Sequence, residues 1–144
     1  MYAIIRIRGS INISPDIKKT FELLNLRRVN NLSIWQENKQ TLKMIKKVEN
    51  YATFGKIDDD TLKLLIEKRG NILDTEKNEK VDASKMATEL KAGKTCNEIN
   101  LKNCFRLSPP KKGFERKGIK RPFKLGGALG NRNEKINDLI KRMI

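Results

Sequence analysis

The sequence predicts an α+β fold: a compact β-α-β-α-β core with a helical insertion and a basic C-terminal extension. Strand-like and helix-like patterns alternate over residues 1–57, and helical patterns follow over residues 58–104. Proline, glycine and basic residues then fill much of residues 105–144. Five elements in so short a core favour a small sheet with both helices on one face. We expect residues 58–104 to form a helical, net acidic segment packed on the core. We expect residues 105–144 to form a basic extended arm with a C-terminal helix.

The strands expected in the core are short and rich in apolar residues. Tyr2–Arg8 partly alternates, so that Ala3 and Ile5 share one face of a strand. Leu32–Gln36 follows a turn signal and is short enough for a second strand. Ala52–Ile57 is the third expected strand.

Two helices are expected between these strands. Ser14 followed by Pro15 is typical of a helix start, because serine caps the first turn and proline fits its first position. Apolar residues then recur at helical spacing. This spacing predicts one helix over Pro15–Leu26 and a second near Lys39–Asn50.

The helical segment begins at Asp58–Asp60, where acidic side chains favour the positive end of a helix dipole. This third helix is expected to end at Gly70, which is a plausible C-terminal cap. The polar stretch Asn71–Lys80 is expected to be a loop. Asp82 then begins a short fourth helix that continues through Leu90.

The basic extension differs from the rest of the chain in composition. Leu107–Gly130 contains three prolines and five glycines and has no helical or strand period, so an extended arm or long loop is expected. Asn131 or Asn133 can then cap a last helix. Its apolar stripe would be formed by Ile136, Leu139, Ile140 and Met143.

Positive charge is the dominant feature of the composition. The chain has 32 Lys+Arg, 17 Asp+Glu and no histidine, for a formal net charge of +15. The net charge is +7 over residues 1–57, −2 over residues 58–100 and +10 over residues 101–144. Because such self-repulsion destabilises a folded domain, a polyanionic partner is expected. Because the positive charge is concentrated in residues 1–57 and 101–144, we predict that these two segments face the polyanionic partner.

Several other classes of function find little support. No apolar run approaches the roughly 18 residues of a membrane-spanning helix, and the first strand follows no signal peptide, so we expect a cytoplasmic protein without a membrane partner. Cys96 and Cys104 cannot make a four-ligand zinc site without histidine. Histidine, the commonest general base in enzymes, is also absent from the sequence. The glycine-rich stretch Gly126–Gly130 is not expected to bind a nucleotide, because no strand precedes it and it does not end in the Gly-Lys-Ser/Thr of a phosphate-binding loop. We therefore expect no enzyme activity, metal, cofactor or small-molecule substrate.

The strongest candidate site is Lys111–Lys124, where seven basic side chains oppose one acid, Glu115. Glycines let a backbone approach phosphates, and phenylalanines can stack on unpaired bases. Core arginines form a second set, since a guanidinium fork matches phosphate oxygens. The simpler alternative for Lys111–Lys124 is a disordered basic tail, but the helix expected after it argues against that alternative. For the core arginines the simpler alternative is solvated surface charge. The predicted RNA-binding residues are Arg6, Arg8, Arg27, Arg28, Arg106, Lys111, Lys112, Phe114, Arg116, Lys117, Lys120, Arg121, Phe123, Lys124 and Arg132.

Three stretches carry a resemblance to a known family. They are MYAIIRIRG at the start, LNLRRVNN with MIKKVENYATFGKI in the middle, and FRLSPPKKGF with GIKRPFKLGGALGNRNEKINDLI near the end. The chain resembles the archaeal and eukaryotic branch of the universal large-subunit ribosomal protein L-thirty family, called L-seven in eukaryotes. The resemblance runs nearly end to end and is weakest over Asn71–Asn103. Family members often have histidine where Arg27 and Ser108 stand, and an Arg-Gly pair where Leu42–Lys43 stands.

The resemblance implies a ferredoxin-like core, in agreement with the order of the patterns, and an extension that reaches into ribosomal RNA (rRNA). It implies a structural constituent of the large ribosomal subunit that binds and stabilises rRNA of the 23S type, with neighbouring ribosomal proteins as partners. Contact with 5S rRNA is a further expectation. The residues alone leave two alternatives open. A basic DNA-binding or chromatin-associated protein would bind duplex DNA at least as well as RNA, and an RNA-processing enzyme would need an acid such as Asp58.

Overall fold

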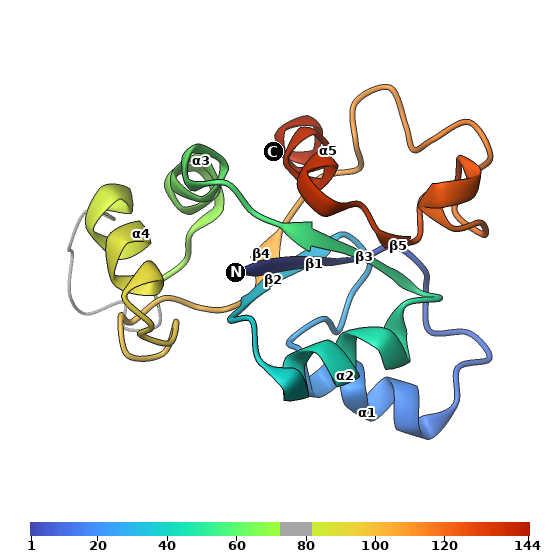
Figure 1. Cartoon of the computed structure of the whole chain (residues 1–144), viewed down its shortest axis with the longest axis horizontal. Coiled ribbons are helices and arrows are strands. Elements are labelled where there is room, and N and C mark those ends of the chain that lie inside the picture. The colour runs from blue at the N-terminus through green and yellow to red at the C-terminus, as the bar shows by residue number, and fades with distance from the viewer. Residues whose placement is uncertain (73–81) are drawn as a thin grey trace.

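The computed structural model describes residues 1–72 and 82–144, and a mixed sheet lies at its centre (Figure 1). In the described part of the chain the sheet has five strands in the order β4-β2-β1-β3-β5. All neighbouring strands are antiparallel except β3 and β5, which are parallel. The strands are β1 (Tyr2–Arg6), β2 (Asn31–Trp35), β3 (Ala52–Lys56), β4 (Phe105–Arg106) and β5 (Gly130–Asn131).

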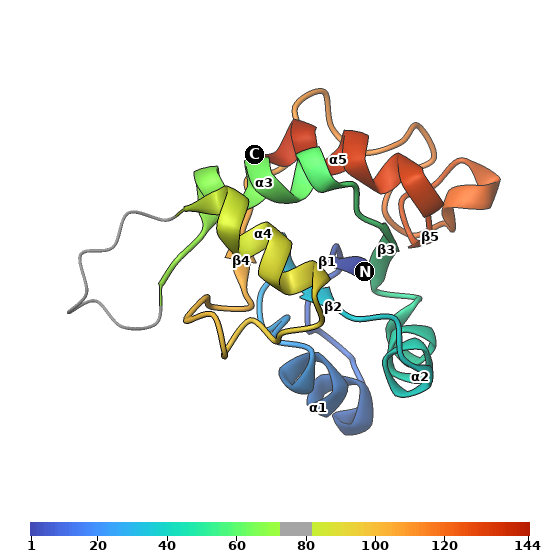
Figure 2. The same ribbon diagram turned by 60° about the vertical axis from the view of Figure 1, so that its left-hand side comes forward.

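Helices cover both faces of this sheet. Helices α1 (Pro15–Leu23) and α2 (Lys39–Val48) lie on one face, and α3 (Asp59–Arg69) and α5 (Ile136–Met143) lie on the other (Figure 1). Helix α4 (Ala83–Lys91) packs beside α3, as a turned view also shows (Figure 2). The prediction that the first two helices share a face is therefore confirmed.

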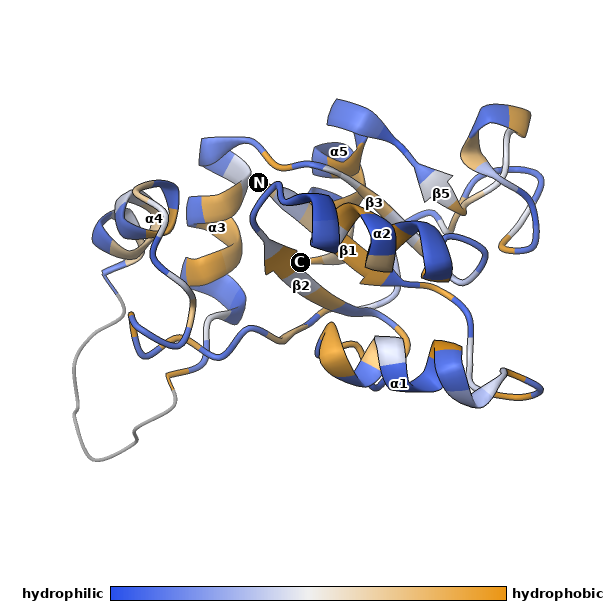
Figure 3. Ribbon diagram, turned by 60° about the horizontal axis from the view of Figure 1, so that its bottom comes forward, coloured by the Kyte–Doolittle hydropathy of each residue, from blue (hydrophilic) through white to orange (hydrophobic). Residues whose placement is uncertain are grey.

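Alternation along β1 sends its side chains into two separate cores. Ala3 and Ile5 belong to the apolar cluster under α3 and α5, whereas Ile4 belongs to the cluster under α1 and α2. Because both faces are covered, the strands are largely hydrophobic, while the outer surface of α2 is strongly hydrophilic (Figure 3). The sequence had predicted this division of the side chains of β1.

The order of elements in the core agrees with the sequence prediction, and the differences lie at element ends. The first strand ends at Arg6 instead of Arg8. The first helix ends at Leu23 instead of Leu26, because Asn25 adopts a positive φ of 59° that turns the chain. Ser14 precedes that helix in the expected extended conformation, but its side chain makes no capping hydrogen bond. The loop expected over Asn71–Lys80 lies mostly outside the described residues.

The expected third helix is present, but its cap differs from the prediction. Gly70 follows Arg69 with φ −65°, so it is not a left-handed cap. The fourth helix also agrees with the prediction. Asp82 precedes it, and Gly93 turns the chain after it with a φ of 98°.

The C-terminal segment is not the separate extended arm that the sequence suggested. Strands β4 and β5 add to opposite edges of the sheet, and α5 contributes to the larger apolar core. The predicted stripe of α5 is fully buried. The two strands were missed because each spans two residues, too short for any periodic pattern.

Residues 107–130, which we call the basic loop, fold back onto the body. The backbone N–H of Ser108 donates to the carbonyl of Met143, and that of Lys111 donates to Arg142. Within the loop, the N–H of Ala128 donates to the carbonyl of Gly118 at 3.1 Å. A long loop was expected, and one is present. It is closed and hydrogen-bonded, however, and not extended.

Candidate nucleic-acid interface

The basic loop presents its lysines and arginines to solvent on a fixed backbone. Gly127 shows how closely this backbone is packed, because a Cβ atom there would lie 2.1 Å from the carbonyl oxygen of Arg121. The exposed basic residues of the loop are Lys111, Lys112, Arg116, Lys117, Lys120, Arg121 and Lys124. These side chains can neutralise the phosphates of a polyanion without a large ordering cost for the backbone that carries them.

Arg132 anchors the basic loop to the sheet from a buried position, with a relative exposure of 3%. Its Nε donates to the hydroxyl of Thr53 on β3 at 2.9 Å, and one terminal nitrogen donates to the carbonyl of Ala128 at 3.1 Å. The guanidinium also pairs with the carboxylate of Glu115 and lies 4.6 Å from the ring centre of Phe123. We had predicted Arg132 to contact RNA directly. The structure corrects this, because all these contacts occupy the group inside the protein.

The carboxylate of Glu115 is the acidic partner within the basic loop. Burial by itself raises the pKa of this carboxyl. Hydrogen bonds from Arg132 and the charges of Arg132 and Arg142 outweigh that effect, so the net pKa lies below its ordinary value. A terminal nitrogen of Arg142, on α5, lies 3.5 Å from the same carboxylate. Glu115 therefore stays charged near neutral pH and offsets the buried charge of Arg132.

Arg6 is the second predicted contact that the structure places in the interior. One terminal nitrogen donates to the carbonyls of Leu26 and Arg27, both at 2.9 Å. The other donates to the hydroxyl of Ser10, and Nε donates to the carbonyl of Arg8. Burial lowers the pKa of this guanidinium. Arg6 thus joins the turns at both ends of α1 to the sheet, and direct RNA contact by Arg6 was a wrong expectation.

Arg8 remains accessible and lies near the basic loop. Its guanidinium carbon is 4.8 Å from the ring centre of Tyr51, and it donates to the carbonyl of Asn50 at 3.2 Å. A cavity of about 550 Å³ is lined by both Arg8 and Lys120. The fold therefore brings one predicted residue of the core next to the basic loop.

The two phenylalanines of the basic loop are half-buried and pack inside the protein. Phe114 packs against the small cluster of Ile7, Ala128 and Leu129. The ring of Phe123 lies under the Arg132 guanidinium. Both rings therefore help to hold the loop on the body, which is a simpler account than the predicted stacking on bases.

A second basic surface lies along the β2–β4 edge of the sheet, and we call it the edge cleft. Its volume is about 660 Å³. No acid is among the described residues that line it, and its basic residues are all exposed. The cleft is lined by Asn25, Arg27, Arg28, Asn31, Asn71, Lys102, Cys104 and Arg106. All three arginines of the edge cleft were predicted to bind RNA, and the fold brings them together.

Sequence reasoning missed Lys102 and the asparagines of the edge cleft. Pairing of Asn31 with Arg106 across β2 and β4 is what joins these distant segments. The amide of Asn31 also donates to the sulfur of Cys104 at 3.2 Å. Burial raises the pKa of the Cys104 thiol, so this cysteine stays neutral beside the arginines. No local pattern around Lys102 signals this pairing.

Residues 1–72 and 82–144, which the structure describes, contain neither a candidate membrane span nor a candidate metal site. None of their helices is long and apolar enough to cross a membrane. They also contain no group of three or more cysteine, aspartate or glutamate side chains placed to hold a metal ion.

The fold and these surfaces define a class: an α+β protein with two basic surfaces suited to a polyanion. Comparisons with known proteins narrow this class. The family model described as ribosomal protein L30p/L7e matches residues 2–52. Large ribosomal subunit protein uL30 of Methanococcus maripaludis is 41% identical over 153 residues, with 99% of each chain covered. The uL30 proteins of Nanoarchaeum equitans and Aeropyrum pernix are 45% and 40% identical, each over 100% of this chain and 99% of the relative. The chain belongs to the uL30 family of large ribosomal subunit proteins.

Proposed function

We propose that this chain is a structural, non-catalytic constituent of the large ribosomal subunit in the cytoplasm, where it binds and stabilises rRNA. The observation that carries the proposal is end-to-end similarity, at about 40% identity, to proteins named as large ribosomal subunit constituents. The alternative of a DNA-binding or chromatin protein finds no support among these relatives.

The basic loop and the edge cleft are the parts of the surface that suit this role. Exposed lysines and arginines neutralise phosphates and release counterions, which supplies much of the affinity for a polyanion. Irregular surfaces of this kind recognise RNA mainly by shape. The RNA-contacting residues in this proposal are Arg8, Arg27, Arg28, Lys102, Arg106, Lys111, Lys112, Arg116, Lys117, Lys120, Arg121 and Lys124.

The proposed partner is the long rRNA of the large subunit, of the 23S type, with neighbouring ribosomal proteins around it. Two basic surfaces on one folded chain support contact with more than one RNA segment. We extend the proposal to 5S rRNA as a second partner. Crosslinking of the assembled subunit, followed by sequencing of the RNA attached to this chain, distinguishes the two RNAs.

Sedimentation of tagged protein from a cell lysate tests the proposal as a whole. The protein is expected to migrate with the large subunit through a sucrose gradient before and after a high-salt wash. Persistence after the wash would indicate an integral contact, because peripheral electrostatic contacts are screened by salt. Migration at the top of the gradient, or with DNA, would contradict the proposal.

A further inference from the structure

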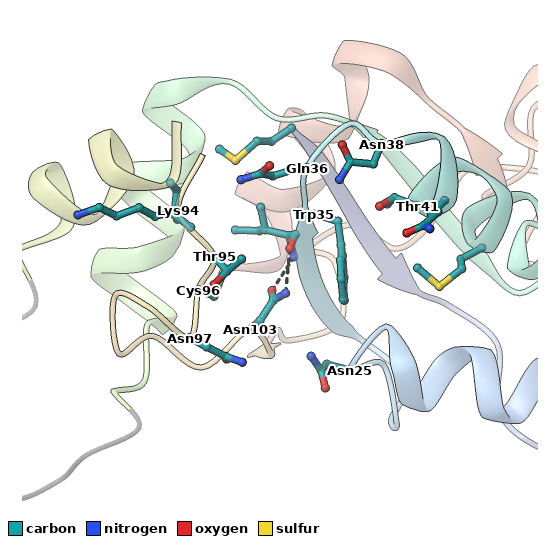
Figure 4. Close-up of a pocket in the computed structure, with 15 residues that line it drawn as sticks. Asn25, Trp35, Gln36, Asn38, Thr41, Lys94, Thr95, Cys96, Asn97 and Asn103 are labelled. Carbon is teal, nitrogen blue, oxygen red and sulfur yellow. Dashed lines mark hydrogen bonds between the residues drawn. The ribbon is translucent and has the colours of Figure 1, made fainter. Parts of the chain in front are cut away.

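A cavity of about 360 Å³, lined by apolar as well as polar side chains, lies at the end of β2 (Figure 4). It is open to solvent and is lined by the end of β2, the start of α2, and the segment that follows α4. Its volume is at the lower end of the range for small-molecule sites, roughly 300–1,000 Å³. No acidic residue is among its described lining residues, and Lys94 is the one charged side chain there. The cavity therefore suits a neutral, flat, polar group.

Trp35, the single tryptophan of the chain, forms one wall of this cavity. Part of its side chain packs against the apolar cluster under α1 and α2, and its indole nitrogen donates to the hydroxyl of Ser33 at 3.2 Å. The ring is thus held in place while it stays partly accessible. A fixed tryptophan ring beside a cavity is a suitable surface for base stacking.

Carboxamide side chains supply the polar part of the cavity, and Figure 4 shows several of them around the space next to Trp35. The side chains of Asn25, Asn38 and Asn97 make no hydrogen bond to another residue in the described part of the chain. Asn103 is instead fixed, because it bonds both the N–H and the carbonyl of Ile34 at 2.9 Å. Each carboxamide offers a donor and an acceptor, which matches the mixed edge of a nucleobase, adenine above all.

Asn25 lines both this cavity and the edge cleft, so the two spaces adjoin. The edge cleft carries several basic side chains and suits phosphates, whereas the cavity has an aromatic wall and Lys94 as its one charged side chain. Together they match the two halves of a nucleotide unit. We propose that the cavity is a binding site for an unpaired RNA base, which stacks on Trp35 while its flanking phosphates lie in the edge cleft. This inference rests on the proposed RNA-binding function and names a site for it.

Fluorescence of the full-length protein tests the inference, since Trp35 is its single tryptophan. The probes are a short single-stranded oligoadenylate and an abasic oligomer with the same phosphates. Oligoadenylate is expected to quench Trp35, and the abasic oligomer is not. Because stacking contributes roughly 1–3 kcal/mol per base, Trp35→Leu should weaken oligoadenylate binding about tenfold and leave abasic binding unchanged. Anisotropy of end-labelled oligomers measures these affinities, since the variant has no tryptophan.

A second variant covers the case in which Trp35→Leu fails to fold. Asn38→Ala combined with Asn97→Ala leaves the ring in place and should lower the affinity for oligoadenylate several-fold. Ser84→Ala combined with Thr88→Ala, at two exposed polar positions on α4 that do not line the cavity, is the matched control and should bind as the parent does. Equal binding of both oligomers without quenching would overturn the base site and leave the RNA-binding function standing. Failure of the protein to migrate with ribosomal subunits would contradict the function itself.

Discussion

The guanidinium of Arg132 and the carboxylate of Glu115 form a two-pronged ion pair that ties the basic loop to the sheet. The two residues are 17 positions apart in the sequence, and Arg132 also bonds Thr53 on β3. The acid in the basic loop is therefore a structural partner and does not merely reduce the positive charge of the surface. The shape of the proposed RNA surface depends on this buried pair.

Glu115→Gln should destabilise the protein, because it leaves the buried Arg132 without a compensating charge. Loss of one partner of a buried ion pair typically costs about 3 kcal/mol or more. Urea unfolding at pH 7 measures the change in free energy of unfolding. Glu22→Gln, at an exposed acid on α1, is the control and should change this free energy little. Equal stability of the Glu115→Gln variant and the parent would show that the pair does not anchor the loop.

The same ion pair predicts a pH dependence. The pKa of Glu115 is lower in the folded protein than its ordinary value, which is about 4.3 in an unfolded chain. Its stabilising contribution is therefore fully present above that pH and is lost as the pH falls through the lower, folded pKa. The stability difference between the parent and Glu115→Gln should shrink over that acidic window. Unfolding curves at several pH values from 7 downward measure it, and a constant difference would contradict the assignment.

Periodicity in the sequence was sufficient to predict most of the core. Apolar spacing located α1, α2 and α5, and alternation correctly divided Ala3 and Ile4 between two faces. Those patterns are local, so one element is enough to reveal them.

The features that the sequence did not predict depend on contacts between segments that are distant in the chain. Arg6 shares a face with Ile4 and looks like a surface residue in the sequence. In the structure α1 covers that face, and the turn after α1 supplies carbonyls for the guanidinium. The edge cleft likewise exists only because β4 pairs with β2. A local pattern in one segment cannot reveal a neighbour that comes from another.

Arg6→Met should lower stability without removing an RNA contact. The substitution keeps apolar volume against Phe21 but leaves the carbonyls of Leu26 and Arg27 without their donor. Each buried group left unpaired costs about 1–3 kcal/mol. Thermal unfolding measures the loss, and RNA affinity below the unfolding temperature should stay near that of the parent. A stable variant with weakened RNA binding would instead return Arg6 to the interface.

Gly55→Ala should weaken the packing of α5 against β3. A Cβ at Gly55 would lie 2.1 Å from the carbonyl oxygen of Asn133 and 2.9 Å from the Cβ of Ile136. The backbone must shift to relieve these contacts, and overpacking of this kind costs about 1–3 kcal/mol. Chemical unfolding measures the loss. The control is Gly9→Ala, because an added Cβ there meets nothing within 4 Å. Equal effects of the two substitutions would contradict the close packing at Gly55.

Lys120→Ala combined with Arg121→Ala should weaken RNA binding and leave the fold intact. Both side chains are exposed, and the backbone carbonyl of Arg121, which accepts from Leu129, is retained. If each side chain neutralises one phosphate, the slope of log affinity against log salt should fall by about 0.7–0.9 per residue. Filter binding to rRNA fragments over a salt series measures this slope, and circular dichroism checks the fold.

The matched control for this pair is Lys63→Ala combined with Lys68→Ala on α3, which removes the same net charge from the segment expected to face away from RNA. That control should leave the slope close to its parental value, because long-range effects of surface charge are screened within about 10 Å at 0.1 M salt. Equal losses in the two double variants would mean that net charge alone governs binding. A loss confined to the basic loop would support direct phosphate contact there, since only neutralised phosphates change the number of released counterions.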